Sequence, residues 1–489
     1  MADRSMRNPG RTGGRRWLAL ALAAVVLAGC GSAAPTITPA ASPPASAAAL
    51  PTATSPSPSA VPVSPEPIVT PTPAPAPGPT ISTGTDGIAL AISSAARPST
   101  TPEEATGAAA EVNAFGLDLF RRVATGSGNV VVSPASIAIA LAMARAGAKG
   151  ETAAQMDRVL RSFGSDADAA GVNALDQSLS ALDRVYDNWS GGQGPPPEVV
   201  LQLANAPFAQ RDMALQPAYL DALATRFGAG LRLVDFQADP DGARQLVNAW
   251  VKAQTKGRIP ALLSPPTITT LTRLVLVNTI YLKAPWLEPF DPKATMPEPF
   301  TRADGSTLSV PTMSARGSYG HAAGNGWWAV ELPYLGTLAL TIIVPDDLSR
   351  FSAALTPAQL ARITGALSPR PIALHLPRFG VDTGPISLAD DLIAMGMPLA
   401  FDQQRADFSG ITAEEALYIS AVVHQANIDV DEKGTEAAAA TAVIGSTAGP
   451  GYQGPWPELR VDRPFLFALR DRATGAVLFL GRVTDPTAR

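Results

Sequence analysis

Prolines are unevenly distributed along the chain, and they limit what its N-terminal part can form. Residues 31–80 contain 15 of the 47 prolines and a single charged side chain, Glu66. A segment of Pro, Ala, Ser and Thr buries too little apolar surface to fold, and alternating prolines favour extended polyproline geometry. We therefore expect residues 30–102 to form a disordered stalk and residues 103–489 to form a folded body.

The first 29 residues have the features of an export signal. Arginines precede the apolar run Trp17–Gly29, which is too short for a stable membrane-spanning helix but suits the core of a signal peptide. The run ends in Leu27-Ala28-Gly29-Cys30, which resembles a bacterial lipobox. That resemblance implies a lipoprotein signal peptide at residues 1–29, lipid on Cys30, and an extracytoplasmic protein anchored to the cell membrane or cell surface. The alternative is an ordinary secretory signal with an incidental cysteine.

The composition of the body excludes several classes of site. From Glu103 onward there are 31 basic and 39 acidic residues, a net charge of about −8, whereas binding to nucleic-acid phosphates needs a basic face. Cys30 is the single cysteine, which excludes disulfides and cysteine-ligated metal sites. We expect no nucleic-acid partner, no metal and no cofactor.

Motifs typical of enzymes are missing from the sequence. No serine has glycine two residues away on both sides, there is no His-Glu-x-x-His helix, and Gly147–Thr152 lacks the Gly-Lys-Ser/Thr ending of a phosphate loop. The three histidines, His321, His375 and His424, are widely spaced. A lone histidine in an apolar strand is more often a core residue, so a hydrolase triad built on His375 or His424 is only the third alternative.

The order of the predicted elements places the body in the α+β class, because helices and strands segregate along the chain. Helical periodicity and cap residues predict helices at Val112–Leu119, Ala135–Ala146 (capped by Ser133), Gln216–Phe227 and Asp241–Thr255, and a further helix capped by Thr152. Apolar runs predict strands at Leu274–Lys283, Leu338–Val344, Ile372–Phe379, Ala421–Val430, Glu458–Val461, Phe465–Arg470 and Ala476–Val483, with a hairpin turn at Arg472–Gly475.

One segment, Gly434–Pro457, fits neither type of element. It joins two predicted strands and contains four consecutive alanines. In an extended chain Thr435, Ala437 and Ala439 share one face, and such small or β-branched side chains can enter a sheet without a steric clash. A short exposed helix at Glu436–Ala442 is equally compatible with these residues.

Seven segments of the body, in the expected order, resemble segments of the serpin family. They are Asn129–Pro134 with Ser136 and Gly147–Thr152; Asn248–Val251 with Thr255, Gly257 and Ile259; Leu274–Lys283 with Trp286, Pro289 and Phe290; Leu376–Phe379; Ala406–Ile411; Glu432–Thr441; and Arg463–Phe465. The resemblance covers Glu103–Arg489. It implies a serpin-like fold with three β-sheets, eight or nine helices and an exposed reactive-centre loop at residues 434–457.

The resemblance also implies a function, that of a serine protease inhibitor rather than an enzyme. In this family a protease cuts the loop as a substrate, the freed loop inserts into the largest sheet, and the acyl-enzyme is trapped. We expect a monomer whose partners are serine proteases, with cysteine proteases as a second class. The residues implied for the hinge are Glu432, Gly434, Thr435, Ala437, Ala438, Ala439 and Ala440. Those implied to support opening of the sheet are Ser133, Ser136, Asn278, Trp286 and His424.

The position of the reactive bond follows from the family's spacing. Counting from Glu432 places it at Ala448–Gly449, and alanine suits the shallow pocket of an elastase-like or subtilisin-like protease. Pro450 follows at once and the return path is long, so Tyr452–Gln453, which suits a chymotrypsin-like pocket, is the alternative. The alternative function is a non-inhibitory serpin-like surface binding protein, which would be cut without trapping the protease.

Overall fold

The computed structural model describes residues 80–84, 86–161, 166–187, 196–435 and 454–488 of the 489-residue chain. All of them belong to one compact unit, Ala74–Arg489. The helices of this described part are α1 (Pro102–Val123), α2 (Pro134–Arg145), α3 (Gly150–Leu160), α4 (Asp166–Ser180), α5 (Pro217–Phe227), α6 (Pro240–Gln254), α7 (Leu348–Ala354), α8 (Pro357–Gly365) and α9 (Ala389–Met395), with short 3-10 turns at Pro292–Ala294 and Pro398–Phe401.

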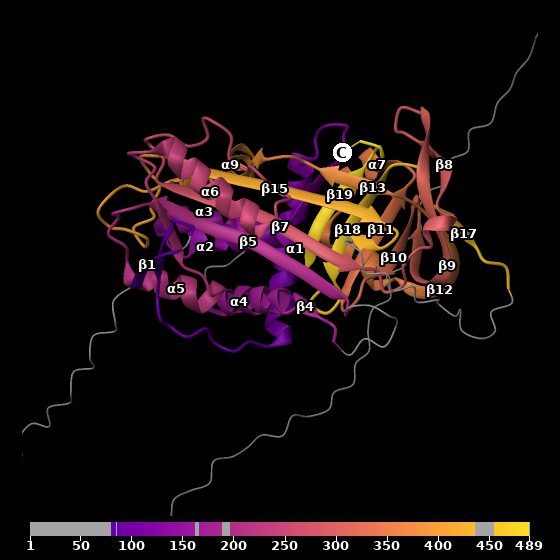
Figure 1. Ribbon diagram of the computed structural model, residues 1–489, viewed down its shortest axis with the longest axis horizontal. Helices are drawn as coiled ribbons and strands as arrows, with labels where there is room; N and C mark the ends of the chain where they lie inside the picture. Colours follow the sequence, from indigo (N-terminus) through magenta and orange to yellow (C-terminus); the bar gives the residue numbers. More distant parts are fainter. Residues whose placement is uncertain (1–79, 85, 162–165, 188–195, 436–453, 489) are drawn as a thin grey trace, which may run out of the picture. The chain divides into compact units, whose positions relative to one another are not determined.

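The first sheet runs in the order β1-β2-β6-β5-β7-β16-β15-β13. Its strands are β1 (Thr80–Thr83), β2 (Ala89–Ile92), β5 (Glu198–Gln210), β6 (Leu231–Val234), β7 (Leu274–Pro285), β13 (Phe379–Asp382), β15 (Ile419–Asp431) and β16 (Gly434–Thr435), with β4 (Arg184–Val185) on β5 and β14 (Ile386–Ser387) on β15. β7 and β15 are parallel neighbours in the middle of this sheet. Figure 1 shows them side by side, with α6 lying across one face.

The second sheet runs in the order β17-β12-β9-β10-β11-β18-β19-β3, with β8 on β9. Its strands are β3 (Val130–Val132), β8 (Met296–Thr301), β9 (Thr307–Gly324), β10 (Trp327–Pro333), β11 (Leu338–Pro345), β12 (Ser368–Pro377), β17 (Glu458–Arg460), β18 (Phe465–Asp471) and β19 (Val477–Val483). The long strand β9 pairs with β8, β10 and β12. The three predicted sheets therefore appear, within the described residues, as two hydrogen-bonded sheets.

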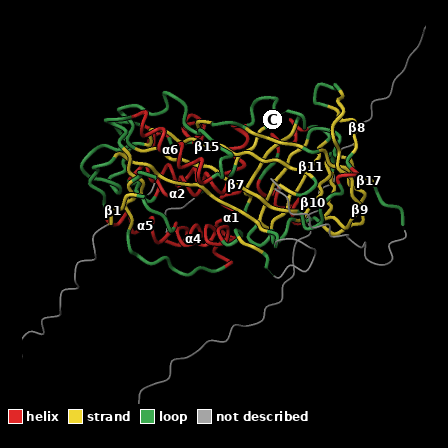
Figure 2. The backbone as a smooth tube through the Cα atoms, viewed as in Figure 1, coloured by secondary structure: helices red, strands yellow, loops and turns green. Residues whose placement is uncertain are grey.

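The predicted α+β class is confirmed. Helices gather around the first sheet, whereas the second sheet is mostly strand and loop (Figure 2). Ser133 caps α2 as predicted, its hydroxyl accepting from the amide of Ser136. The predicted cap Thr152 is wrong: α3 begins at Gly150, and the Thr152 hydroxyl instead accepts from the amide of Asp407.

Two further boundaries differ from the sequence expectation. The predicted strand Ile372–Phe379 is two strands, because the chain leaves the second sheet at Pro377 and enters the first at Phe379. The predicted stalk does not extend to residue 102. Within the described residues Thr80–Thr83 and Ala89–Ile92 form strands, and Ile88 and Ala91 are buried. Residues 80–97 contain no proline, but they follow the proline-rich segment directly and were grouped with it.

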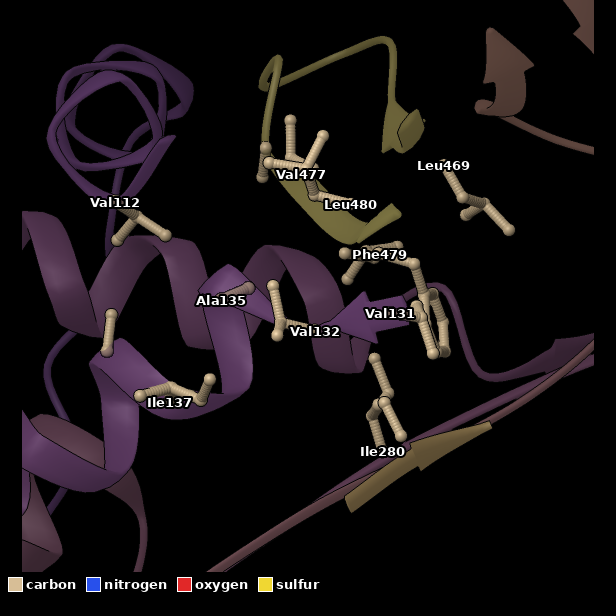
Figure 3. Packing of buried hydrophobic residues seen from close by; sticks show 14 of the residues in the cluster. Val112, Val131, Val132, Ala135, Ile137, Ile280, Leu469, Val477, Phe479 and Leu480 are labelled. Carbon is tan, nitrogen blue, oxygen red and sulfur yellow. The ribbon is translucent and has the colours of Figure 1, made fainter. Parts of the chain in front are cut away.

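The main hydrophobic core joins the two sheets through α1, α2 and β3. Ile280 of β7 points toward Val131 of β3 and Phe479 of β19 (Figure 3). The helix α2 is buried almost all around because its interior positions are Ala, Ile, Leu and Met. A second, smaller cluster, which includes Phe208, Val247 and Trp250, lies between α6 and the opposite face of the first sheet. The first sheet is thus covered on both faces.

Candidate functional site

The candidate site is the seam where β7 and β15 meet in the first sheet. From Leu274 to Ile280 the two strands pair directly with each other. At the far end of β7 the pairing changes, since β16 lies between them: Gly434 and Thr435 pair with Pro285 and Ala284 of β7 on one side. On the other side the same two residues pair with the end of β15. The start of the predicted reactive-centre loop is therefore a strand of the sheet.

This placement corrects one expectation. The loop was predicted to be exposed from residue 434, but Gly434 and Thr435 are buried. Gly434 has φ +148°, and a Cβ at this position would lie 2.1 Å from the carbonyl oxygen of Ala284. The clash would be with backbone of the central strand, which cannot move aside. Glycine is thus required for β16 to fit against β7.

Two aromatic side chains hold the hinge at the top of the seam. The indole NH of Trp286 donates to the carbonyl of Asp431 at 2.8 Å, and its backbone NH donates to the carbonyl of Lys433 at 2.9 Å. The ring of Trp286 stacks on that of Tyr334 with centroids 4.1 Å apart. The Tyr334 hydroxyl lies 2.5 Å from the hydroxyl of Thr435. Trp286 therefore supports the hinge directly.

The side chain of Glu432 anchors the chain just before β16. Its carboxylate accepts from Arg378 Nε at 2.7 Å and Nη2 at 2.6 Å, and also from the Thr295 hydroxyl. Burial alone would raise the pKa of Glu432, but these hydrogen bonds outweigh it and hold the pKa below its usual range. Arg378 reaches this position because it is the residue at which the chain crosses from β12 to β13.

A buried polar cluster lies under the middle of the seam. The Asn278 amide of β7 donates to the Ser136 hydroxyl at 2.7 Å and to Asn205 Oδ1 at 2.6 Å. Across the seam, His424 of β15 bonds to Asn278 Oδ1 through Nδ1. The backbone NH of Ser133 donates to His424 Nε2 at 3.2 Å. The cluster therefore links both strands of the seam to the start of α2.

The protonation of His424 follows from these partners. Because Nε2 accepts a hydrogen bond, Nδ1 carries the proton and donates it to Asn278. The ring is fully buried, and the burial lowers its pKa from 6.5 to about 3. His424 is therefore a neutral member of the cluster, and its hydrogen-bond partners among the described residues are the Asn278 amide and the Ser133 backbone NH, neither of them an acid or a nucleophile.

Among the residues that the structure describes, neither of the other two histidines forms a Ser–His–acid relay. His375 contacts Ser314, Glu298 and Arg460 at the edge of the second sheet, 3.1 Å from the Ser314 hydroxyl and 2.9 Å from the Glu298 carboxylate. One Nδ1 atom makes both of these contacts, so Glu298 and Ser314 do not form a relay through the ring. His321 lies in β9.

The structure brings together the five predicted support residues, but in two groups. Ser133, Ser136, Asn278 and His424 form the polar cluster, whereas Trp286 lies at the hinge. Sequence reasoning missed Asn205, Tyr334 and the role of Arg378. Asn205 is a polar residue within the otherwise apolar end of β5, which is a signal the sequence carries. Tyr334 follows β10 and gives no such signal.

Several predicted residues lie outside the described residues. They are Cys30, the hinge alanines Ala437, Ala438, Ala439 and Ala440, and both candidate reactive bonds, Ala448–Gly449 and Tyr452–Gln453. Among the described residues no helix is long and apolar enough to cross a membrane. The same part of the chain contains no group of three or more His, Cys, Asp or Glu side chains placed to hold a metal ion.

The fold and the seam define a class of protein in which the start of a long loop is already a strand of the largest sheet. The family model described as Serpin (serine protease inhibitor) matches residues 110–486. This chain belongs to the serpin family, as its sequence motifs predicted.

Individual relatives agree with this assignment. The leukocyte elastase inhibitor of Bos taurus is 34% identical over 386 residues, covering 76% of this chain and 97% of the relative. An uncharacterized serpin-like protein of Thermococcus kodakarensis is 36% identical over 380 residues, covering 77% of this chain and 85% of that protein. The crystal structure of native protease nexin-1 with heparin matches with a TM-score of 0.67 at 29% identity, covering 79% of this chain and 100% of that one.

Proposed function

We propose that this chain inhibits serine proteases by acting as a suicide substrate. One observation carries the proposal: Gly434 and Thr435 already pair in register between β7 and β15. The chain that follows Thr435 could continue along the same two strands if they separated. The similarity to leukocyte elastase inhibitors supports a serine protease as the target and an elastase-like enzyme as the first to test.

The chemistry is that of an interrupted proteolysis. The serine hydroxyl of the protease attacks the carbonyl carbon of Ala448, the bond to Gly449 breaks, and the new amino terminus leaves with the proton. Ala448 is then joined to the protease by an ester. Because Ala448 and Gly449 are no longer connected, the segment after Thr435 is free to enter the sheet, and the attached protease moves with it.

Insertion supplies enough free energy to explain trapping. Slowing hydrolysis of the ester a millionfold needs about 8 kcal/mol, and loss of oxyanion-hole alignment in the distorted protease supplies roughly 3–4 kcal/mol of that. A ten-residue strand adds about ten backbone hydrogen bonds, each contributing about 1 kcal/mol net. After Glu436 the segment continues with four small side chains, Ala437–Ala440, so these four positions carry no charge that insertion would have to desolvate.

The hinge offers a sharp test of this mechanism. Gly434→Ala places a Cβ 2.1 Å from the Ala284 carbonyl oxygen, so β16 loses its pairing with β7, the pairing from which insertion would continue. The matched control is Gly107→Ala, where a Cβ meets nothing within 4 Å. After mixing with elastase or subtilisin, we expect wild type and Gly107→Ala to give a denaturant-stable covalent band, whereas Gly434→Ala is cut without forming one. Equal bands from all three proteins would contradict the mechanism.

A second variant tests insertion independently of the hinge contacts. Ala437→Glu introduces a charge that insertion would bury, at a cost of several kcal/mol if it stays unpaired. We expect cleavage to continue and the covalent band to weaken. If wild type itself is cut without any stable band, the chain is instead a non-inhibitory serpin-like surface protein.

The reactive bond is proposed to be Ala448–Gly449. Mass spectrometry of the C-terminal fragment released by elastase identifies the bond through its new amino terminus. We expect that fragment to begin at Gly449. A fragment beginning at Gln453 would move the bond to Tyr452–Gln453 and the target class to chymotrypsin-like proteases.

We also propose that the inhibitor is a lipoprotein outside the cytoplasm. The support is the sequence Leu27-Ala28-Gly29-Cys30 behind an arginine-rich, apolar leader. Expression in a bacterium fed radiolabelled palmitate is expected to label the wild-type protein in the membrane fraction. Cys30→Ser is expected to lose the label, and labelling of that variant at the wild-type level would contradict the proposal.

A further inference from the structure

Residues 86–98 lie just before the part of the chain that the serpin family model matches, which begins at residue 110. They include β2, which pairs antiparallel with β6 through Ala89–Leu233 and Ala91–Leu231 and so extends the edge of the first sheet. We propose that residues 86–98 form an edge strap that restrains this sheet from opening until the loop is cut. The inference rests on the insertion mechanism proposed above.

The first anchor of the edge strap is hydrophobic and reaches both faces of the sheet. Ile88 is 1% exposed and belongs to the cluster beneath α6 that contains Phe208 and Trp250. Ala91 is fully buried and belongs to the main core. A Cβ on Gly230 would lie 2.7 Å from the carbonyl oxygen of Ala91, so glycine at the start of β6 permits this close approach.

The second anchor is polar and fixes the end of the edge strap to α4 and α5. Arg97 Nε donates to Asn173 Oδ1 at 2.7 Å, and Nη2 donates to Asp176 Oδ2 at 2.5 Å. The same Nη2 donates to the carbonyl of Arg226, the last-turn residue of α5, at 3.3 Å. Asn173 also donates to the carbonyl of Pro98 at 3.3 Å. The edge strap therefore ties the sheet edge to two helices.

The buried charge of Asp176 is stabilised by its ion pair with Arg97. Burial raises the pKa of Asp176, and the charge and hydrogen bond of Arg97 oppose that rise. A buried carboxylate that loses its cation is strongly unfavourable. Movement that separates these two side chains is therefore resisted more than the breaking of an exposed ion pair would be.

Insertion of a strand requires such movement. A new strand between β7 and β15 widens the sheet by about 4.8 Å, the spacing between neighbouring strands. The β13 side is held to β3 of the second sheet, because the Thr383 hydroxyl bonds both the amide and the carbonyl of Val131, at 3.0 and 2.9 Å. The strands that have to move are then those on the other side of the seam, β7, β5, β6 and β2. α4 packs far more extensively against α1 than against β5, so it stays with α1, and a shift of that size pulls the edge strap away from Asp176.

The edge strap thus favours the uninserted form selectively. Before cleavage its anchors are intact and oppose separation of the seam. After insertion they are lost, and the added strand compensates for them. Weakening the edge strap is expected to accelerate spontaneous insertion of the uncut loop, while leaving the inserted form unaffected.

The test uses the full chain with Arg97→Ala, and Asp176→Asn as a second variant that keeps the shape of the side chain. The control is Arg158→Ala, since the pair Arg158–Glu151 is 61% and 59% exposed. Each uncut protein is incubated at a temperature below its own Tm, and the fraction that becomes both more heat-resistant and resistant to elastase is followed with time. The Tm of each elastase-cleaved protein is measured in parallel.

We expect both edge-strap variants to convert at least tenfold faster than wild type, a difference of about 1.4 kcal/mol in the barrier, and Arg158→Ala to match wild type. The Tm of the cleaved proteins should be the same in all four. The inference is overturned if conversion rates agree within twofold, or if the cleaved variants lose as much Tm as the uncut ones. If wild-type protein gains no heat resistance on cleavage, the insertion mechanism itself fails and the edge strap with it.

Discussion

The seam of the first sheet and the β18–β19 hairpin of the second are built in different ways. At the seam two parallel strands are held over a polar cluster in which Asn278 and His424 bond to each other across the sheet. The hairpin is antiparallel and its buried side chains are mostly apolar, with Phe467 and Phe479 fully buried and the polar Asp471 and Thr474 only at its turn. A Cβ on Gly481 would lie 2.3 Å from the Phe467 ring, so that ring fits closely over β19.

This difference shows which sheet can change its strand order. Side-chain packing in the hairpin is lost entirely when the strands separate, because apolar contacts have no alternative partner in water. Hydrogen bonds at the seam can be exchanged for those of an inserted strand without burying unsatisfied groups. We therefore expect the second sheet to stabilise intact and cleaved protein equally, and the seam to distinguish them.

The largest expected effect comes from the hairpin. Phe467→Ala removes a fully buried ring and is expected to lower the free energy of unfolding by about 4 kcal/mol. Urea unfolding of intact and elastase-cleaved protein should show the same loss in both forms. A loss of unfolding free energy in the intact form alone would contradict the expectation that the second sheet stabilises both forms equally. Val185→Ala, at a position that is 50% exposed, is the control and should change stability by less than about 0.5 kcal/mol.

The second effect is a pH dependence that originates at the seam. His424 has a folded-state pKa of about 3, below its usual 6.5. As pH falls below 6.5 the unfolded chain binds a proton that the folded protein excludes, so stability decreases with falling pH in this window. Between pH 6.5 and 4.5 this residue accounts for about 2 kcal/mol.

The measurement is urea unfolding at these two pH values for wild type, His424→Asn and His321→Gln. Carboxylates contribute equally to all three proteins. His424→Asn should therefore reduce the difference in stability between the two pH values by about 2 kcal/mol, whereas His321→Gln should leave most of that difference in place. Equal pH dependence in wild type and His424→Asn would mean that His424 is not held neutral.

The smallest effect compares two asparagines, the buried Asn278 and the half-buried Asn113. Asn278→Ala removes one hydrogen bond each from His424, Ser136 and Asn205 and should lower the stability of the intact protein by about 2 kcal/mol. Asn113 of α1 bonds the hairpin instead, donating to the carbonyl of Gly475 and accepting from the amide of Val477, both at 2.8 Å.

Asn113→Ala should cost about 1 kcal/mol, equally in intact and cleaved protein. Only Asn278→Ala should also alter the rate at which the uncut loop inserts, because only Asn278 lies on the seam. The comparison is read from urea unfolding of both forms and from the conversion of uncut protein at raised temperature. If Asn113→Ala changed the rate of insertion of the uncut loop by the same factor, the claim that the seam controls insertion would be contradicted.

Much of the fold was predictable because local signals agreed with the tertiary structure. The predicted helix at Gln216–Phe227 is α5 at Pro217–Phe227, and the predicted hairpin turn carries Gly475 at φ +79°. Apolar periodicity and turn chemistry report these elements directly. The class α+β and the family assignment follow from the same segments.

The features that were missed depend on contacts between distant segments. β2 is a four-residue strand of Ala, Leu and Ile beside a proline-rich segment, and only pairing with β6 makes it a strand. β16 was expected to be exposed because it begins the predicted reactive-centre loop, and only its pairing between β7 and β15 buries it. Arg378 and Glu432 lie far apart in the chain, and neither signals the other. Sequence patterns describe single elements, whereas these sites arise where elements meet.

The central claim is that the first sheet accepts the cut loop as a new strand, and its most direct test is the heat stability of intact and cleaved protein. Elastase-cleaved and intact samples are compared by calorimetry under the same conditions. We predict that cleavage raises the Tm by more than about 10 °C, because roughly ten added hydrogen bonds contribute on the order of 10 kcal/mol. An unchanged or lower Tm after cleavage would contradict the account.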